Sequence, residues 1–270
     1  MLAALGSLAT QQSSPTQNTI KKVKQLLDYA ATHPDAIVTY NASDMVLAAH
    51  SDASYLSESN AQSRAGGHFF MSSDTETPPN NGAVMTISQI IKAVLSSAAE
   101  AEVGALFINC REAVPARHVL EFLGHKQPPT PMQTDNTTAL GVVNQNVMKK
   151  LKAMDMKYHW LRCRISQEQF RHYWKSGRTN LADYPTKHHP SIHHQATRGT
   201  YFTDISKLIE LRNRLRNRQK SYAMTTLTKP PRSKGVLDIL GRPNTRDYEK
   251  ALGSLKLLTE KYRGSHRISI

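Results

Sequence analysis

The sequence predicts an α/β protein with a mixed five-stranded sheet and helices on its faces. Short extended runs separated by clusters of Ser, Asn, Asp, Gly and Pro fill residues 36–92, a pattern typical of antiparallel strands joined by turns. Helical periodicity replaces this pattern from Ser96 onward. Two later short runs alternate with helical segments, and this order favours a single sheet with helices packed on it.

The first predicted element is an amphipathic helix over residues 19–32. Apolar residues recur there at helical spacing with lysines between them: Ile20, Val23, Leu26, Leu27 and Ala30. The helix ends at His33, because the residue before a proline avoids the helical region. We expect residues 1–35 to form an amino-terminal segment that precedes a domain over residues 36–200.

Four extended runs follow the helix. They cover residues 36–40, 45–50, 67–71 and 83–91, and polar or glycine-containing turns separate them. Asp52 lies just beyond the second run, in a stretch of small residues that indicates a turn. The pattern therefore places one carboxylate at the end of a buried strand.

The middle of the chain is predicted to be helical. Residues 96–110 form one helix and residues 114–123 a second, which ends at Gly124 because glycine is typical of the position after a helix C-cap. A proline-rich connector then leads into a short strand at residues 132–135. This strand again ends on an aspartate.

The last predicted elements alternate between helix and strand. Asn136 or Thr137 is a suitable N-cap for a helix that runs through Val143. Residues 147–165 have the pattern of a long, basic amphipathic helix, and residues 170–174 alternate like a strand.

Charge separates the carboxy-terminal part from the rest. Residues 204–270 hold 16 Lys+Arg against 6 Asp+Glu, and so account for +10 of the net charge of +14. We expect residues 201–270 to form a basic helical or disordered tail. Such an excess favours a polyanionic partner, although a solvated tail has the same composition.

Cysteine content and hydropathy indicate the compartment. Cys110 and Cys163 are far apart and neither has a second cysteine nearby, which is typical of a reducing environment and excludes a disulfide framework. No apolar run approaches the length of a membrane span. We expect a cytoplasmic or nuclear protein without a membrane partner.

Four acidic residues stand out by position: Asp52, Glu102, Asp135 and Asp183. Magnesium prefers a few carboxylate ligands, so isolated acids at strand ends and helix starts suit magnesium-dependent phosphodiester cleavage. Taken singly, each has an ordinary alternative role, such as a turn aspartate, a helix cap or a solvated glutamate. Glu100 is an alternative to Glu102, since residues two apart on a helix point to nearly opposite sides.

The settings of these acids are recognisable when taken together. The stretches are His50-Ser51-Asp52-Ala53, Ala101-Glu102-Val103-Gly104-Ala105-Leu106, Met132-Gln133-Thr134-Asp135 and Asn180-Leu181-Ala182-Asp183. In this order they resemble the ribonuclease H domain at the end of a Ty1/copia-type retrotransposon polyprotein, downstream of the reverse transcriptase. The resemblance covers roughly residues 22–190.

The resemblance implies a ribonuclease H-like fold and a metal-dependent endonuclease that hydrolyses the RNA strand of RNA/DNA hybrids. It implies two Mg²⁺ ions, with Mn²⁺ as a substitute. Asp52, at the centre of the first strand, would bridge both ions, and Glu102 would bind one of them near the ribose 2′-hydroxyl. Asp135 would position the attacking water. Asp183 would open the last helix and complete the second site.

Further roles follow from the same resemblance. Contacts to nucleic acid are expected from Asn136, Lys149, Lys150, Arg162 and Asn180. The expected partners are the RNA/DNA hybrid and a reverse transcriptase domain of the same element.

The chain departs from the family pattern in several places. Arg178 stands where cellular ribonucleases H carry a histidine, and residues 86–92 lack the usual Trp and Ser-Lys-Lys-Gln run. An alternative interpretation is therefore a catalytically inactive, nucleic-acid-binding remnant of such an element. A scaffold protein with the same fold is a third.

Overall fold

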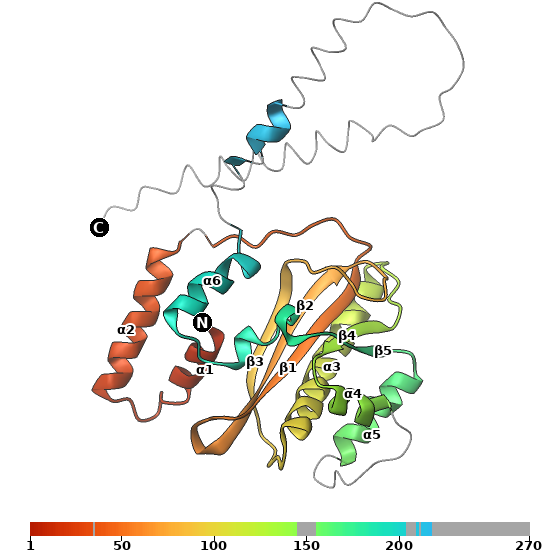
Figure 1. The fold of residues 1–270 in the computed structure, drawn as a ribbon, viewed down its shortest axis with the longest axis horizontal. Coiled ribbons are helices and arrows are strands. Elements are labelled where there is room, and N and C mark those ends of the chain that lie inside the picture. Colours follow the sequence, from red (N-terminus) through yellow and green to blue (C-terminus); the bar gives the residue numbers. More distant parts are fainter. Residues whose placement is uncertain (35, 145–154, 204–208, 211, 218–270) are drawn as a thin grey trace, which may run out of the picture. The chain divides into compact units, whose positions relative to one another are not determined.

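The computed structural model describes residues 1–34, 36–144, 155–203, 209–210 and 212–217. Its centre is one five-stranded sheet with the order β3-β2-β1-β4-β5 (Figure 1). The strands are β1 (Val46–Glu58), β2 (Gln62–Ser72), β3 (Ala83–Ile91), β4 (Thr130–Thr134) and β5 (Phe170–Trp174). β1 to β3 pair antiparallel, whereas β4 pairs parallel with both β1 and β5. The prediction of a mixed five-stranded sheet is confirmed.

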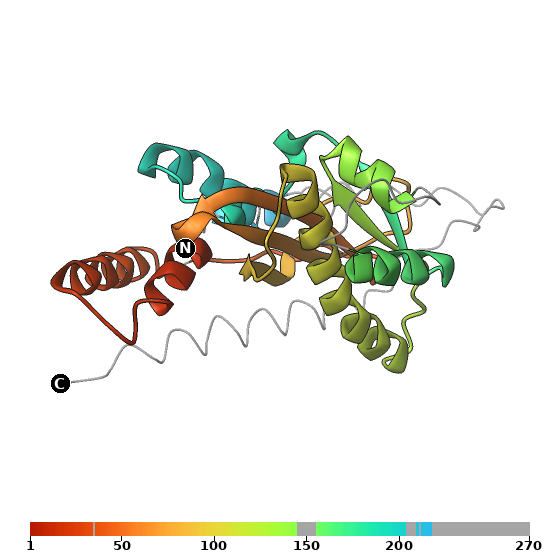
Figure 2. The same ribbon diagram turned by 90° about the horizontal axis from the view of Figure 1, so that it is seen from below.

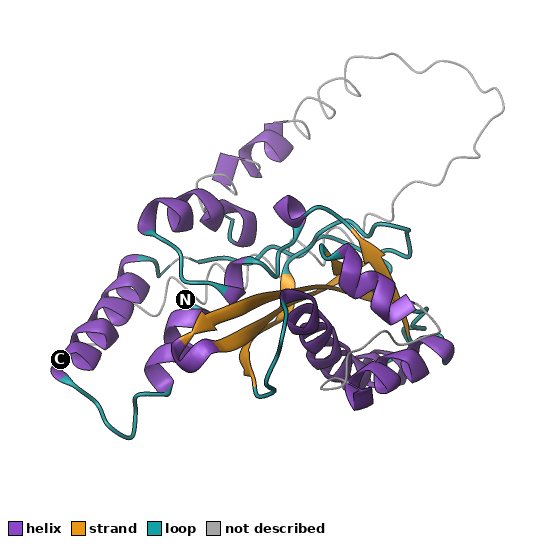
Figure 3. Ribbon diagram, turned by 60° about the horizontal axis from the view of Figure 1, so that its bottom comes forward, coloured by secondary structure: helices purple, strands orange, loops and turns teal. Residues whose placement is uncertain are grey.

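The helices are α1 (Leu2–Ala9), α2 (Gln17–Thr32), α3 (Ala98–Phe122), α4 (Thr137–Asn144), α5 (Asp155–Ser166) and α6 (Ser191–Tyr201). α3 packs against β1 and β2, and α4 and α5 pack beside it against β5 (Figure 3). α1 contacts β3, and α2 stands farther from the strands (Figure 2). The described residues up to Leu215 form one compact unit.

The core lies between the sheet and α3. Fully buried apolar side chains from the sheet, from α3 and from the neighbouring α5 meet there, among them Leu47, Phe69, Leu106, Met132 and Leu161. Burial of each such side chain contributes about 1.5–3 kcal/mol. This layer fixes where the amino-terminal half of α3 lies against β1.

Two predicted elements differ from the structure. Residues 36–40 form no strand, and only an isolated bridge joins Ile37 to Thr203. The two helices predicted between Ser96 and Leu123 are one, α3, with Pro115 in its interior. Proline costs a helix about 3 kcal/mol. The helix continues past it because Ala113 and Leu120 stay buried on either side.

Asp52 lies within a strand, as the resemblance implies, and not in the turn that the local pattern of small residues indicates. β1 extends to Glu58 because β2 pairs with it beyond Asp52, at Ala53↔Ala65 and Ser54↔Arg64. The small residues around Asp52 therefore belong to a strand on which other elements pack closely from both faces of the sheet.

Gly66 and Gly67 of β2 explain this close cover. A Cβ at Gly66 would lie 2.4 Å from the Ala182 carbonyl oxygen, and a Cβ at Gly67 would lie 2.1 Å from Asn109 Oδ1. Asn109 belongs to α3 and Ala182 to the segment on the other face of the sheet. The glycines let both layers approach the strands.

The segment after Asp183 was also predicted differently. Asp183 precedes a short 3-10 turn at Tyr184–Thr186, and the last helix, α6, begins only at Ser191. Proline disfavours helical geometry in the residue before it, and Pro190 itself has extended backbone just ahead of α6. The turn is tied to the sheet by Ser88 Oγ, which donates to the Pro185 carbonyl at 2.7 Å.

Other predictions hold or fall outside the described residues. α2 and β5 match their predicted ranges closely, and Asn136 caps α4 by accepting a hydrogen bond from the Ala139 N–H at 2.9 Å. Residues 145–154 and 218–270 are outside the described part, so the first half of the helix predicted at 147–165 and most of the tail stay predictions. No helix among the described residues is long and apolar enough to cross a membrane.

Candidate metal centre

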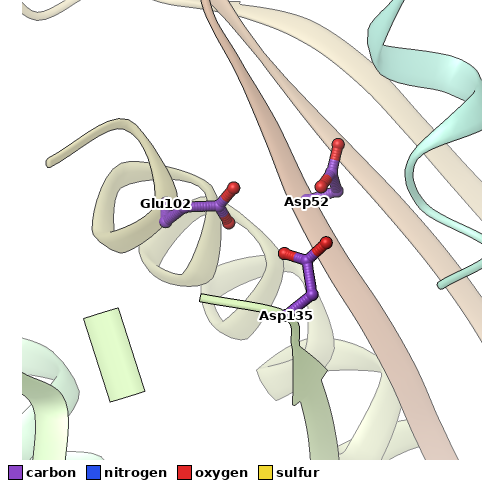
Figure 4. A group of neighbouring side chains, drawn as sticks. All are labelled: Asp52, Glu102 and Asp135. Carbon is purple, nitrogen blue, oxygen red and sulfur yellow. The ribbon is translucent and has the colours of Figure 1, made fainter. Parts of the chain in front are cut away.

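Three of the four predicted acids converge on one point. Carboxylate oxygens of Asp52, Glu102 and Asp135 lie within 4.8 Å of one another (Figure 4). The three side chains come from β1, from α3 and from the residue directly after β4. Residues 83 positions apart in the chain thus share one site.

Strand register accounts for the pair of aspartates. β1 and β4 are parallel neighbours, with Ala49 opposite Met132 and His50 opposite Gln133. Continuing this register by two residues places Asp135 beside Asp52. Residues directly opposite each other on neighbouring strands point to the same face of the sheet, so both carboxylates project on the same side.

The start of α3 accounts for the glutamate. Ser97 caps the helix by accepting a hydrogen bond from the Glu100 N–H at 3.2 Å, and the Glu100 carboxylate accepts one from the Ser96 N–H at 2.7 Å. The Glu100 carboxylate is thereby bound to the backbone just before the first turn of α3. Glu102 points toward β1, where its Oε1 accepts a hydrogen bond from the Ala53 N–H at 3.3 Å. Glu102 and not Glu100 lies in the cluster.

Burial and mutual repulsion make these carboxyl groups resist ionisation. Burial, and then the charges of Asp52 and Asp135, raise the pKa of Glu102 to about 9. Burial and the charge of Asp183 raise the pKa of Asp52 to about 7, although Lys187 and a hydrogen bond from Thr186 oppose the rise. Burial, followed by the Asp183 charge, also raises the pKa of Asp135.

The donor set fits a small, hard divalent cation. All three donors are carboxylate oxygens, and Glu102 Oε2 is buried without a hydrogen-bond partner in the described part of the chain. Oxygens on opposite sides of a Mg²⁺ ion lie about 4.2 Å apart, so a small inward movement would bring the three to one ion. A cation would also relieve the repulsion that raises the pKa values.

Asp183, the fourth predicted acid, is near the cluster but outside the group of three. Its carboxylate pairs with the Lys187 ammonium. The charge of Asp183 still acts on Asp52 and Asp135. Thr186, which directly precedes Lys187, donates a hydrogen bond from Oγ1 to Asp52 Oδ2 at 2.9 Å.

Sequence reasoning missed three residues at this site. Thr186 and Lys187 follow Asp183 at spacings of three and four, the spacings at which side chains meet on one turn of helix, and that signal was available. Trp174 closes β5 and donates from its indole nitrogen to the Asp135 carbonyl at 2.9 Å, while half of its side chain is exposed. Only the strand register places Trp174 beside the cluster.

The predicted nucleic-acid contacts are distributed unevenly. Asn180 is buried, and its amide binds the Ser51 carbonyl and the Ala182 N–H. Arg162 is half-buried and donates to the Val143 carbonyl at 3.1 Å. Lys149 and Lys150 lie outside the described residues. Contact of these residues with nucleic acid stays a prediction.

Strand order and acidic centre together define the class of protein. Three antiparallel strands followed by a long helix and two parallel strands, with carboxylates converging from β1, from α3 and from the end of β4, are the features of a ribonuclease H-like fold. No family model matches the chain.

One curated protein is similar to the chain in sequence. The chain is 24% identical over 185 residues to the retrovirus-related Pol polyprotein from transposon TNT 1-94 of Nicotiana tabacum, a match that covers 68% of this chain. It spans only 13% of that polyprotein. The chain thus has a ribonuclease H-like fold and is similar in sequence to part of a retrotransposon polyprotein.

Solved structures resemble it at low sequence identity. The N-terminal RNase H domain of a Mycobacterium tuberculosis protein is 16% identical, with a TM-score of 0.38, and the match covers 53% of this chain and 91% of that one. LC11-RNase H1 in complex with an RNA/DNA hybrid is 10% identical, with a TM-score of 0.36 and coverages of 51% and 91%. The foamy viral protease-reverse transcriptase in complex with dsDNA is 16% identical, with a TM-score of 0.37 and coverages of 53% and 92%.

Proposed function

We propose that this chain is a metal-dependent endonuclease that hydrolyses the RNA strand of RNA/DNA hybrids. The observation that carries the proposal is the convergence of Asp52, Glu102 and Asp135, with one buried glutamate oxygen left for a cation. Relationship to a retrotransposon polyprotein supports the substrate, because such elements pass through an RNA/DNA hybrid during replication. A reverse transcriptase domain of the same element is the proposed partner.

Each acid has a distinct part in holding the metal. Asp52 and Glu102 are nearly buried, so they form the fixed floor of the site. Asp135 follows β4 and is only half-buried, so it is the acid of the three most accessible to an approaching phosphodiester. Bound Mg²⁺ would polarise the phosphate and lower the pKa of a coordinated water. Asp183 is the proposed additional ligand of a second ion.

The ionisation of the cluster matches this role. Without a cation, the raised pKa values leave Glu102 protonated at neutral pH. A divalent ion must displace that proton, so metal affinity should increase with pH. Cleavage should therefore have an alkaline optimum.

The experiment is cleavage of a labelled RNA/DNA hybrid by the full chain, with and without Mg²⁺. RNA/RNA and DNA/DNA duplexes of the same sequence serve as substrate controls, and Asp52→Asn is the matched variant. Magnesium-dependent cuts in the RNA strand of the hybrid, absent in the variant, are expected. Cleavage that survives in Asp52→Asn would remove the cluster from the mechanism.

A second function has one observation in its favour. Asp183 is neutralised by Lys187 and lies outside the group of three, as in a site that holds a single ion. We infer that a non-catalytic hybrid-binding protein is the alternative. Tight binding of the hybrid by a folded chain that cuts no substrate with either Mg²⁺ or Mn²⁺ would establish it.

A further inference from the structure

Lys187 brings a positive charge into a site otherwise built from carboxylates. Its ammonium pairs with Asp183, and the charges of Asp52 and Asp135 act favourably on it. Burial alone would lower the pKa of Lys187, but the hydrogen bond from its ammonium to Asp183 and these three carboxylates together raise it. Lys187 is a cation held beside the metal cluster.

The backbone that carries Lys187 is firmly placed. The preceding residue, Thr186, is fully buried; its carbonyl accepts a hydrogen bond from Ser54 Oγ at 2.9 Å and its hydroxyl reaches Asp52. Pro185 is tied to Ser88 on β3. Fixed contacts to two strands, β1 and β3, thus hold the start of the lysine side chain.

The side chain itself is partly exposed to solvent. Lys187 is 46% exposed and Asp183 is 36% exposed at the side chain. Exposed ion pairs of this kind contribute at most about 1 kcal/mol and exchange readily with solvent ions. Lys187 can therefore leave Asp183 without unfolding the turn.

We propose that Lys187 occupies the place of a second divalent ion at Asp183, so that the resting site binds one ion between Asp52, Glu102 and Asp135 and gains a second only when the ammonium swings away. This role rests on the proposed function, because it concerns the same metal site. Lys187 is a positioning residue and not a ligand. The pair would keep Asp183 neutralised until a second ion arrives.

The test counts bound Mn²⁺ in the full chain by electron paramagnetic resonance of the free ion, at a fixed pH near 8. Lys187→Gln removes the charge and keeps most of the side-chain length. Lys126→Gln is the matched control, because Lys126 is exposed and precedes β4, at the end of that strand opposite to Asp135. Circular dichroism confirms that each variant is folded.

We expect one Mn²⁺ in the wild type and in Lys126→Gln at concentrations where Lys187→Gln binds two. The second ion should bind about fivefold more tightly once the lysine charge is gone. Adding Asp183→Asn to Lys187→Gln should return the count to one. Equal counts and affinities in the wild type and Lys187→Gln, including no binding in either, would overturn the proposal.

Failure of this proposal is distinguishable from failure of the proposed function. Hybrid cleavage with identical Mn²⁺ binding in both chains would retain the nuclease and reject the role of Lys187. A gain of one Mn²⁺ in Lys187→Gln without any cleavage would retain the role of Lys187 and reject the nuclease.

Discussion

At the scale of single residues, the structure decides between glutamates that the sequence leaves open. Glu100 and Glu102 stand in the same alanine-rich run, and spacing alone cannot say which points inward. The helix start decides, because the Glu100 carboxylate binds the Ser96 N–H while Glu102 faces Asp52. The ion pair between Asp183 and Lys187 spans a 3-10 turn, whereas the sequence analysis expected a helix to begin at Asp183.

The first prediction concerns stability against pH in the absence of metal. Asp52 and Glu102 have pKa values raised to about 7 and about 9, so above pH 4 the folded chain binds more protons than the unfolded chain. Their effect lowers the free energy of unfolding as pH rises from about 4 to about 9. Urea titrations with a metal chelator present should measure this fall.

Glu102→Gln should reverse much of that fall. The variant places a neutral group in the cluster, so at pH 9 the metal-free protein should gain on the order of 2 kcal/mol. Adding millimolar Mg²⁺ should stabilise the wild type and leave the variant unchanged. A variant less stable than the wild type at pH 9 under chelation would show that the glutamate is not under electrostatic strain.

At the scale of elements, local patterns succeed where an element is determined by its own residues. α2 and β5 are amphipathic or alternating over their whole length, and their predicted bounds are close to those observed. β1 and α3 were predicted too short, since pairing with β2 extends one and packing on the sheet carries the other through Pro115. Such tertiary effects leave no local signal.

Gly66 provides the element-scale prediction. Gly66→Ala should destabilise the fold by about 1–3 kcal/mol, because the added carbon meets the Ala182 carbonyl at 2.4 Å. The segment that carries Asp183 and Lys187 would shift, so the Mn²⁺ affinity of the variant should also fall. Thermal unfolding and Mn²⁺ titration give the two measurements.

Gly199→Ala is the matched control for Gly66→Ala. Gly199 lies in α6 with nothing within 4 Å of an added Cβ, so alanine there should stabilise the helix by up to about 1 kcal/mol. If Gly66→Ala unfolds at the same temperature as the wild type, the close contact between β2 and the Asp183 segment is not a constraint.

At the scale of the whole molecule, the acidic centre and the basic excess lie in different parts of the sequence. The compact unit carries the acidic centre, while residues 218–270 hold 12 Lys+Arg against 4 Asp+Glu. Under the proposed function, the basic residues would attract a phosphate backbone and the acidic centre would cut it. The amino-acid composition is enough to predict this separation of charge. The position of Trp174 beside the acidic centre could not be predicted in this way, because it depends on the pairing of β4 with β5.

The salt dependence of hybrid binding tests the role of the basic residues 218–270. Binding of the hybrid should weaken steeply with salt, since neutralised phosphates release counterions. A chain that ends at Asn217 should bind about tenfold more weakly at about 50 mM salt and show a smaller slope of log affinity against log salt concentration. Fluorescence anisotropy with a labelled hybrid measures both, and an unchanged slope would exclude the basic segment from binding.

The most direct test of the central claim compares two glutamates that are two residues apart. Hybrid cleavage with Mg²⁺ is measured for Glu102→Gln and for Glu100→Gln, whose amide oxygen can still accept the Ser96 hydrogen bond. Glu100→Gln should cleave at nearly the wild-type rate, and Glu102→Gln should lose a hundredfold or more, at about the scale of a lost charge-stabilising group. Equal rates in the two variants would contradict a metal centre at Asp52, Glu102 and Asp135.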